Sequence, residues 1–218
     1  MTEKTKNSQS NRNKIIDEYI SHILETGSEP VSVFKFTKDM KMKEAVFYEY
    51  FSSFGAVKKS VWELIFDNTI QALESQEIYQ SYTSREKLLG FLFTWIEELK
   101  NRRSYLLAVY GNVSLKNQSY PSELKGFKAK FKEFASGIVN EGKETEEIAE
   151  RPYLTDKYQE AMWLQVMFVF RFWIKVDSPA FEKTDAAIEK SVNLAFDLMG
   201  RSAIDSFVDF AKFLFQSK

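Results

Sequence analysis

A chain of 218 residues that is 44% hydrophobic can bury a sizeable core, and its 20 Phe, 10 Tyr and 4 Trp predict that this core is aromatic. The absence of Cys excludes a disulfide framework and thiolate chemistry, and it fits a reducing, cytoplasmic location. The net charge of −1 excludes a chain coated with positive charge along its whole length, and only 4 Pro and 8 Gly leave long helical windows. These bounds predict an all-α protein.

Neither a secretory signal nor a membrane span is expected. Residues 1–12 are polar, and the most apolar run, residues 161–176, is too short for a span and carries Gln165 and Arg171. We therefore expect a soluble cytoplasmic protein with no membrane partner.

At the amino terminus, residues 1–12 are rich in Asn, Ser and Lys and predict a disordered arm. An amphipathic helix is expected from about residue 13 to residue 25, before Gly27. His22, the only histidine, borders the apolar face of this helix. A lone His without Cys or a carboxylate cluster is typical of a boundary residue and not of a metal ligand, so no metal or cofactor is expected.

Residues 31–64 contain short helical segments closed by a cluster of aromatic residues, which is typical of a helix-turn-helix module. Ser32 is expected to cap the second helix, with Lys35 facing solvent. In the segment that follows, helical spacing places Met42, Ala45 and Val46 inward and Lys41, Lys43 and Glu44 outward. From spacing alone, a solvated face is the better explanation of these lysines.

The same residues resemble the TetR family of bacterial transcriptional regulators. The family pattern has a helix that ends near Gly, a Thr/Ser-Val start to the second helix, and a recognition helix running into Leu-Tyr-x-Tyr-Phe. The corresponding residues here are Gly27, Ser32-Val33 and the sequence Phe-Tyr-Glu-Tyr-Phe at 47–51. Two positions depart from the pattern: Lys41 replaces a common turn Gly, and residues 53–57 read Ser-Phe-Gly-Ala-Val instead of Ser-Lys-Glu-x-Leu.

The resemblance implies a helix-turn-helix DNA-binding domain at residues 13–60 and a helical domain for ligand binding and dimerisation at residues 61–218. It implies a double-stranded DNA operator as partner, contacted by Ser32, Lys35, Lys41, Lys43, Glu44 and Tyr48. The charge distribution is compatible, because residues 1–60 carry ten Lys and Arg against eight Asp and Glu, while the remainder is net negative.

Local signals also mark helices in the second half. Thr83-x-x-Glu86 forms a capping box before an apolar run, and Pro121 suits the first turn of a further helix. Residues 153–175 are apolar nearly all round, so this helix must be covered by its own domain or by a second subunit. Thr184-Asp185 is expected to cap the last helix.

The last helix carries a long apolar stripe, which predicts a homodimer in which residues 153–175 and 184–218 pair with their symmetry mates. The interface residues predicted on this stripe are Val192, Phe196, Met199, Ala203, Phe207 and Phe210.

Catalysis is not expected, because one His and no Cys leave the usual acid–base and nucleophilic pairings incomplete. The aromatic residues of the second half are the remaining candidates for a site. The resemblance implies an effector pocket there, lined by Trp95, Tyr105, Tyr110, Phe131, Phe134, Trp163 and Met167, with Arg171 as an anion anchor. On the residues alone, a plain core is the simpler interpretation.

The sequence is compatible with two alternative functions. The first is a TetR-like DNA-binding regulator controlled by a small, hydrophobic effector. The alternative is a TetR-fold protein that has lost DNA binding and holds a lipid or another hydrophobic ligand, which the aromatic body and the altered Phe54-Gly55 would suit.

Overall fold

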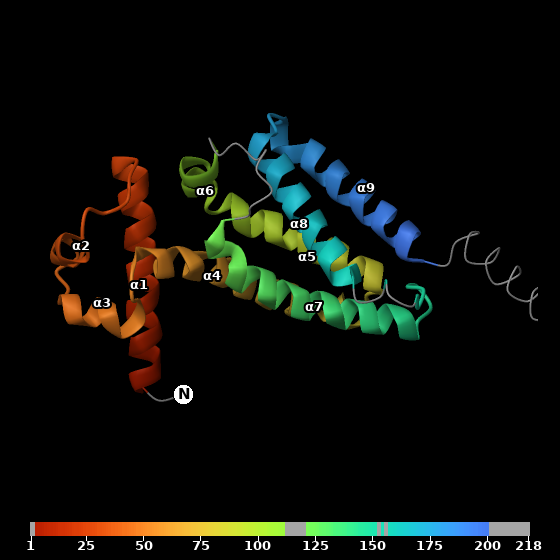
Figure 1. The fold of residues 1–218 in the computed structure, drawn as a ribbon, viewed down its shortest axis with the longest axis horizontal. Coiled ribbons are helices and arrows are strands. Elements are labelled where there is room, and N and C mark those ends of the chain that lie inside the picture. Colours follow the sequence, from red (N-terminus) through yellow and green to blue (C-terminus); the bar gives the residue numbers. More distant parts are fainter. Residues whose placement is uncertain (1–2, 112–120, 152–153, 155–156, 201–218) are drawn as a thin grey trace, which may run out of the picture. The chain divides into compact units, whose positions relative to one another are not determined.

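The computed structural model describes residues 3–111, 121–151, 154 and 157–200, and these residues form helices joined by loops, without a strand (Figure 1). The all-α prediction is confirmed. The α-helices are α1 (Glu3–Thr26), α2 (Val33–Asp39), α3 (Glu44–Tyr50), α4 (Phe54–Glu74), α5 (Ser84–Lys100), α6 (Arg103–Tyr110), α7 (Lys125–Glu144), α8 (Tyr158–Lys175) and α9 (Glu182–Met199). Short 3₁₀ helices are η1 (Glu77–Ser81), η2 (Ser122–Leu124) and η4 (Pro179–Phe181).

The chain divides into two compact units. Unit 1 contains residues 1–68 and 97–128, and unit 2 contains residues 69–96 and 129–218. Unit 1 is therefore larger than the segment 13–60 expected from the sequence, because α6 packs against α1. A boundary drawn along the sequence cannot include an element that returns from later in the chain.

In unit 1, α1 begins at Glu3, so the prediction of a disordered arm over residues 1–12 is wrong from that residue onward. Ile15, Ile16 and Tyr19 are fully buried and form its core face. The helix ends as predicted at Gly27, whose positive φ of 71° suits a residue without a side chain and whose N–H donates to Ile23 O at 2.9 Å.

The three helices that follow close on a cluster of aromatic rings. The Phe54 ring lies 5.6 Å from that of Tyr19, 5.4 Å from that of Phe36 and 5.6 Å from that of Phe47. Phe54 is one of the residues that depart from the TetR pattern. Phe54 is half-buried and its ring contacts three rings of this cluster, so the departure is a change in packing.

In unit 2, α5, α7, α8 and α9 enclose a core of stacked and tilted rings. The ring centroids of Phe91 and Phe131 are 5.2 Å apart, and those of Phe131 and Trp163 are 6.1 Å apart. The predicted capping box at the start of α5 is confirmed, since Glu86 Oε2 accepts from Thr83 N at 2.8 Å and Glu86 N donates back to Thr83 Oγ1 at 3.2 Å.

The predicted cap of the last helix is wrong. The helix α9 begins at Glu182, after Phe181 in a left-handed conformation with φ of 63°, and Thr184 is buried inside its first turn. Within the described residues, none of the helices combines the length and apolarity that a passage through a membrane requires.

Candidate nucleic-acid interface and apolar groove

The turn between α2 and α3 is built around Lys41. Its φ of 53° lies in the left-handed region, which costs an L-residue other than Gly about 1 kcal/mol. Two backbone bonds hold the turn: Lys41 N donates to Lys38 O at 3.0 Å and Met42 N donates to Thr37 O at 2.8 Å. Lys41 thus has a left-handed backbone at the position where the family pattern commonly has Gly, the residue that adopts this conformation most readily.

The start of α2 agrees with the sequence prediction. Ser32 has an extended backbone, and its Oγ accepts from Lys35 N at 3.2 Å, which confirms it as the N-cap. Lys35 and Lys38 are exposed on the same short helix, while Phe36 is buried.

Helix α3 turns one side into the aromatic core and the other to solvent. Phe47 is fully buried, whereas Ala45, Tyr48 and Glu49 are exposed. The prediction that Ala45 packs inward is therefore wrong. A separation of two positions along an α-helix is a rotation of about 200°, so Ala45 lies nearly opposite Phe47.

All six residues expected to contact DNA lie on α2, the turn and α3 or at the cap of α2. Lys41 and Lys43 are exposed as expected, and Glu44 is half-buried. Two further exposed side chains were missed: Val31 is 88% and Phe34 is 63% exposed. Phe34 lies four residues before Lys38 and so shares its outward face on the helix. A hydrophobic residue is normally expected to be buried, and for this reason Phe34 was not predicted to be exposed.

A polar network fixes the base of this module. Tyr19 OH donates to Glu29 Oε1 at 2.8 Å, and Lys58 Nζ lies 2.8 Å from the same oxygen. Burial, followed by the hydrogen bond to Glu29, raises the pKa of Tyr19. Burial alone would raise the pKa of Glu29, but hydrogen bonds from Lys58 and Tyr19 lower it overall. The network therefore joins α1, the loop after it and α4.

A second network inside unit 1 uses two aromatic residues. Trp62 Nε1 donates to Tyr110 OH at 3.0 Å, and Tyr110 OH donates to Glu123 Oε1 at 3.1 Å. Burial is the main cause that raises the pKa of Tyr110, so the phenol remains a neutral donor. These bonds connect α4 and α6 with η2.

The eight residues expected to line an effector pocket are divided between the units. Tyr105 and Tyr110 belong to unit 1. The remaining six belong to unit 2: Trp95, Phe131, Phe134, Trp163, Met167 and Arg171. Trp95, Phe131 and Trp163 are buried almost completely, and Phe134 lies ring to ring with Phe91 at 5.0 Å. Six of the eight are buried, as the simpler interpretation of a plain core expects, whereas Phe134 and Arg171 are half-buried.

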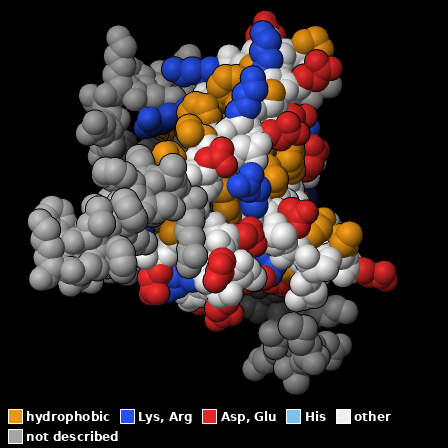
Figure 2. Space-filling view, turned by 90° about the vertical axis from the view of Figure 1, so that its right-hand side faces the viewer, with side chains coloured by type: hydrophobic (Ala, Val, Ile, Leu, Met, Phe, Trp, Pro, Cys, Tyr) orange, Lys and Arg blue, Asp and Glu red, His pale blue; other side chains and the backbone are white. Residues whose placement is uncertain are grey.

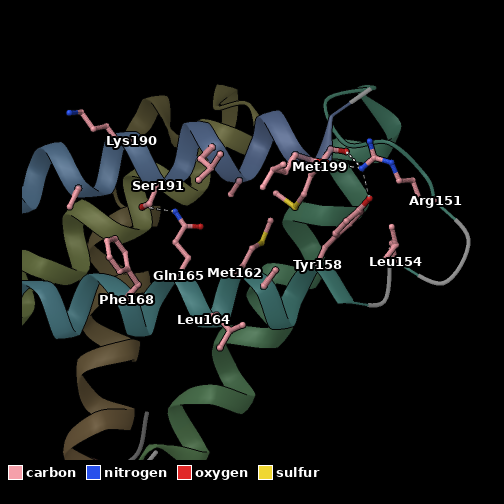
Figure 3. A pocket seen from close by; sticks show the side chains of 15 residues that line it. Arg151, Leu154, Tyr158, Met162, Leu164, Gln165, Phe168, Lys190, Ser191 and Met199 are labelled. Atoms are coloured by element: carbon pink, nitrogen blue, oxygen red, sulfur yellow. Dashed lines mark hydrogen bonds between the residues drawn. The ribbon is translucent and has the colours of Figure 1, made fainter. Parts of the chain in front are cut away.

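The structure instead shows a groove of about 750 Å³ between α8 and α9, which lie side by side (Figures 1 and 3). Half of the large apolar side chains that are exposed in the described part of the chain line it, each between 47% and 67% exposed: Leu154, Leu164, Phe168, Leu194 and Leu198. Figure 2 shows one face of the molecule, on which hydrophobic side chains reach the surface in patches between charged ones.

A few polar groups interrupt the groove. Gln165 is 8% exposed, and its Nε2 donates to Ser191 Oγ at 3.1 Å, which joins the two helices (Figure 3). At one end, Arg151 Nη1 donates to Leu198 O at 2.8 Å and Nη2 donates to Gly200 O at 2.7 Å. Arg151 thereby satisfies carbonyls at the end of α9 that the helix itself leaves without donors.

The family model described as "Tetracyclin repressor-like, C-terminal domain" matches residues 87–214, which is more than half of the chain. The chain belongs to the TetR family. The match covers the second half, where sequence patterns alone indicated only helices. A search among curated proteins finds no significant match.

Solved structures agree with the TetR fold. A bacterial regulatory protein in the tetR family from Rhodococcus RHA1 aligns with a TM-score of 0.54 and 12% identity, covering 88% of this chain and 97% of that chain. The TetR family transcriptional regulator PfmR from Thermus thermophilus aligns with a TM-score of 0.51 and 15% identity, covering 82% and 97%. A protein of unknown function from Rhodococcus sp. RHA1 has a TM-score of 0.57 at 13% identity, covering 87% and 95%. At these identities the likeness is one of fold.

Within this TetR chain, the residues expected at a dimer interface need a correction. Val192, Phe196 and Met199 are at most 4% exposed inside the single chain, so they have almost no surface to offer a partner. Ala203, Phe207 and Phe210 lie outside the described residues. The stripe at that spacing faces the core of unit 2, and the exposed apolar residues of α9 are instead Leu194 and Leu198.

Proposed function

We propose that this TetR-family transcription regulator binds double-stranded DNA through α2, the turn and α3, as a non-enzymatic homodimer controlled by a hydrophobic effector. The observation that carries the proposal is a helix-turn-helix whose outer side presents Lys35, Lys38, Lys41 and Lys43. Lysines in this arrangement neutralise phosphates, and the exposed residues of α3 are then placed against base edges.

Selection from a random DNA pool with the full chain tests the proposal. Low ionic strength is required first, because binding that releases counterions weakens steeply as salt rises. We expect enrichment of sites with two related half-sites, and an affinity that falls with added salt. Folded protein that enriches no sequence would exclude operator binding.

The homodimer is proposed to form through the groove between α8 and α9, and the occupant of the groove is a second copy of the chain. Exposed Leu164, Phe168 and Leu194 lie on neighbouring helices, so a two-fold axis brings the same apolar residues together. The pairing of two helices from each chain gives a four-helix interface. Two half-sites one DNA turn apart, about 34 Å, are the spacing that a two-fold helix-turn-helix dimer recognises.

The effector is proposed to be hydrophobic because the candidate side chains of unit 2 are aromatic or apolar, apart from Arg171. The rings are in contact, so an effector enters only if some of them move. Trp95, Trp163 and Trp173 are buried there and report such a movement through their fluorescence. A screen of lipophilic carboxylates and neutral lipids should give a saturable spectral shift for a true effector.

The second candidate is a hydrophobic-ligand carrier without DNA binding, favoured by the size and apolar lining of the groove. The two functions differ in what fills the groove. Native mass spectrometry of freshly purified protein separates them: the regulator gives an empty dimer, while the carrier gives a monomer with a co-purified lipid.

A further inference from the structure

The helix-turn-helix has an unusual set of base-reading side chains. Between residues 31 and 50 the sequence contains neither Arg, Asn nor Gln. Arg and Lys are the bidentate readers of guanine, and Asn and Gln are the bidentate readers of adenine. Helix α3 itself contains none of these four residue types, so bidentate purine recognition is absent from this helix.

The geometry of α3 shows which of its side chains face away from the core and are available to contact bases. Phe47 anchors the helix in the core, and Ala45 and Glu49 lie two residues before and after it. At about 100° per residue, both point nearly opposite to Phe47, and both are exposed. Tyr48 is exposed beside them, 54% of its surface being accessible. Ala45 and Glu49 thus form the outermost ridge of the helix.

The two residues have different but definite partners in a major groove. The Ala45 methyl is small and apolar, and among base edges only thymine offers a methyl group for it to contact. A Glu49 carboxylate is repelled by phosphate, whereas it accepts a hydrogen bond from the N4 amino group of cytosine. A phosphate-contacting role is therefore excluded for Glu49 and assigned to the lysines around it.

We propose that α3 reads pyrimidines: a thymine methyl through Ala45 and a cytosine amino group through Glu49. The residues are four apart, which is about 6 Å along the helix axis and corresponds to about two base-pair steps of B-DNA. The inference rests on the proposed DNA binding and adds the base chemistry of the half-site.

The test begins with the selected DNA. Each thymine of the enriched half-site is replaced in turn by uracil, which removes the methyl group and keeps base pairing. Loss of one buried methyl contact should weaken binding about fourfold at a single thymine. Uracil at thymines outside the half-site is the control. With Ala45→Gly the thymine and uracil sites should bind equally, and this comparison within one variant is independent of any loss of stability.

Glu49→Gln provides a second readout. The glutamine amide matches the adenine edge, so repeated selection should exchange a cytosine of the half-site for adenine. Three results are distinguishable. An exchanged base and a fourfold uracil effect, about the size expected for one methyl group, support the inference. A selected site that tolerates uracil and keeps its cytosine with Glu49→Gln overturns it while DNA binding stands. Failure of folded wild-type protein to enrich any DNA overturns the inference together with the proposed function.

Discussion

The α2–α3 region and the α8–α9 region differ in the kind of side chain that they expose. In the first, short helices bury a compact group of rings and leave an outer side that presents four lysines beside the exposed Val31 and Phe34. In the second, long helices bury their shared stripe and still leave Leu164, Phe168 and Leu198 uncovered. Exposed charge suits a polyanionic partner, whereas exposed apolar surface is relieved by an apolar one. If the two surfaces are independent, a substitution in one should leave the function of the other intact.

The largest effect is expected from reversing the charge of the turn. Lys41→Glu combined with Lys43→Glu should abolish detectable DNA binding, because two phosphate-attracting groups become repulsive while both side chains are exposed and outside the core. Gel-shift titration over a range of salt measures the loss. Lys175→Glu combined with Lys183→Glu is the matched control, since it reverses the same number of exposed charges on α8 and α9. Equal loss in the control would attribute binding to net charge alone.

The next effect concerns the groove. Leu198 is 67% exposed, so Leu198→Asp should leave the single chain folded. It should raise the dimer dissociation constant about a hundredfold or more, because each copy loses a buried leucine. Sedimentation velocity over a concentration series measures the change, and Ala186→Asp, on α9 outside the groove, should have no effect. A wild-type chain that remains monomeric at tens of micromolar would contradict the two-fold arrangement.

A smaller effect is expected from the ring cluster of unit 1. Phe54→Leu removes aromatic contacts with Tyr19, Phe36 and Phe47, and should lower the free energy of unfolding by about 1–2 kcal/mol. Urea unfolding followed by circular dichroism measures the change. Phe34→Leu is the matched control because that ring is 63% exposed, and it should change stability by no more than about 0.5 kcal/mol. Equal effects of the two substitutions would show that the ring contacts of Phe54 do not stabilise unit 1.

Local signals predicted the first region well. The cap at Ser32 is an interaction between residues three apart, so the sequence contains both partners. The same is true of the capping box at Thr83, which lies outside this region at the start of α5. The misassignment of Ala45 arose because a small apolar residue gives weak information about facing. Phe47 determines the rotation of α3, and that residue could be identified only as one of several aromatics.

The second region was less predictable for a physical reason. The stripe through Val192 and Phe196 was identified correctly as apolar, but periodicity does not distinguish a face that packs on the same chain from one that packs on a partner. Leu194 and Leu198 lie between the stripe positions and looked like ordinary exposed residues. Their grouping with Leu164 and Phe168 depends on how α8 and α9 pack, which is tertiary information.

The smallest effect is expected from the Tyr19–Glu29–Lys58 network, whose contribution to stability can be measured apart from that of the ring cluster. Glu29 has a lowered pKa because Lys58 and Tyr19 hydrogen-bond to it despite the cost of burial. A carboxylate with a lowered folded-state pKa adds stability above its unfolded value of about 4.5 and loses it as pH falls through the folded value. Since the Glu29 side chain is 48% exposed and solvent screens the ion pair, Glu29→Gln should cost only about 0.5 kcal/mol at pH 7.

The difference between wild type and Glu29→Gln should therefore be greatest near pH 7 and shrink toward zero as pH is lowered below 4.5. Urea midpoints of both proteins, measured at about pH 7, 5 and 3 in the same ionic strength, follow this difference directly. Lys58→Met is the companion variant, because it removes the opposite partner of the 2.8 Å ion pair and should show the same convergence at low pH. A gap that stays constant over this whole pH range would assign Glu29 a packing role without charge, and the first region would then be stabilised by its rings and caps alone.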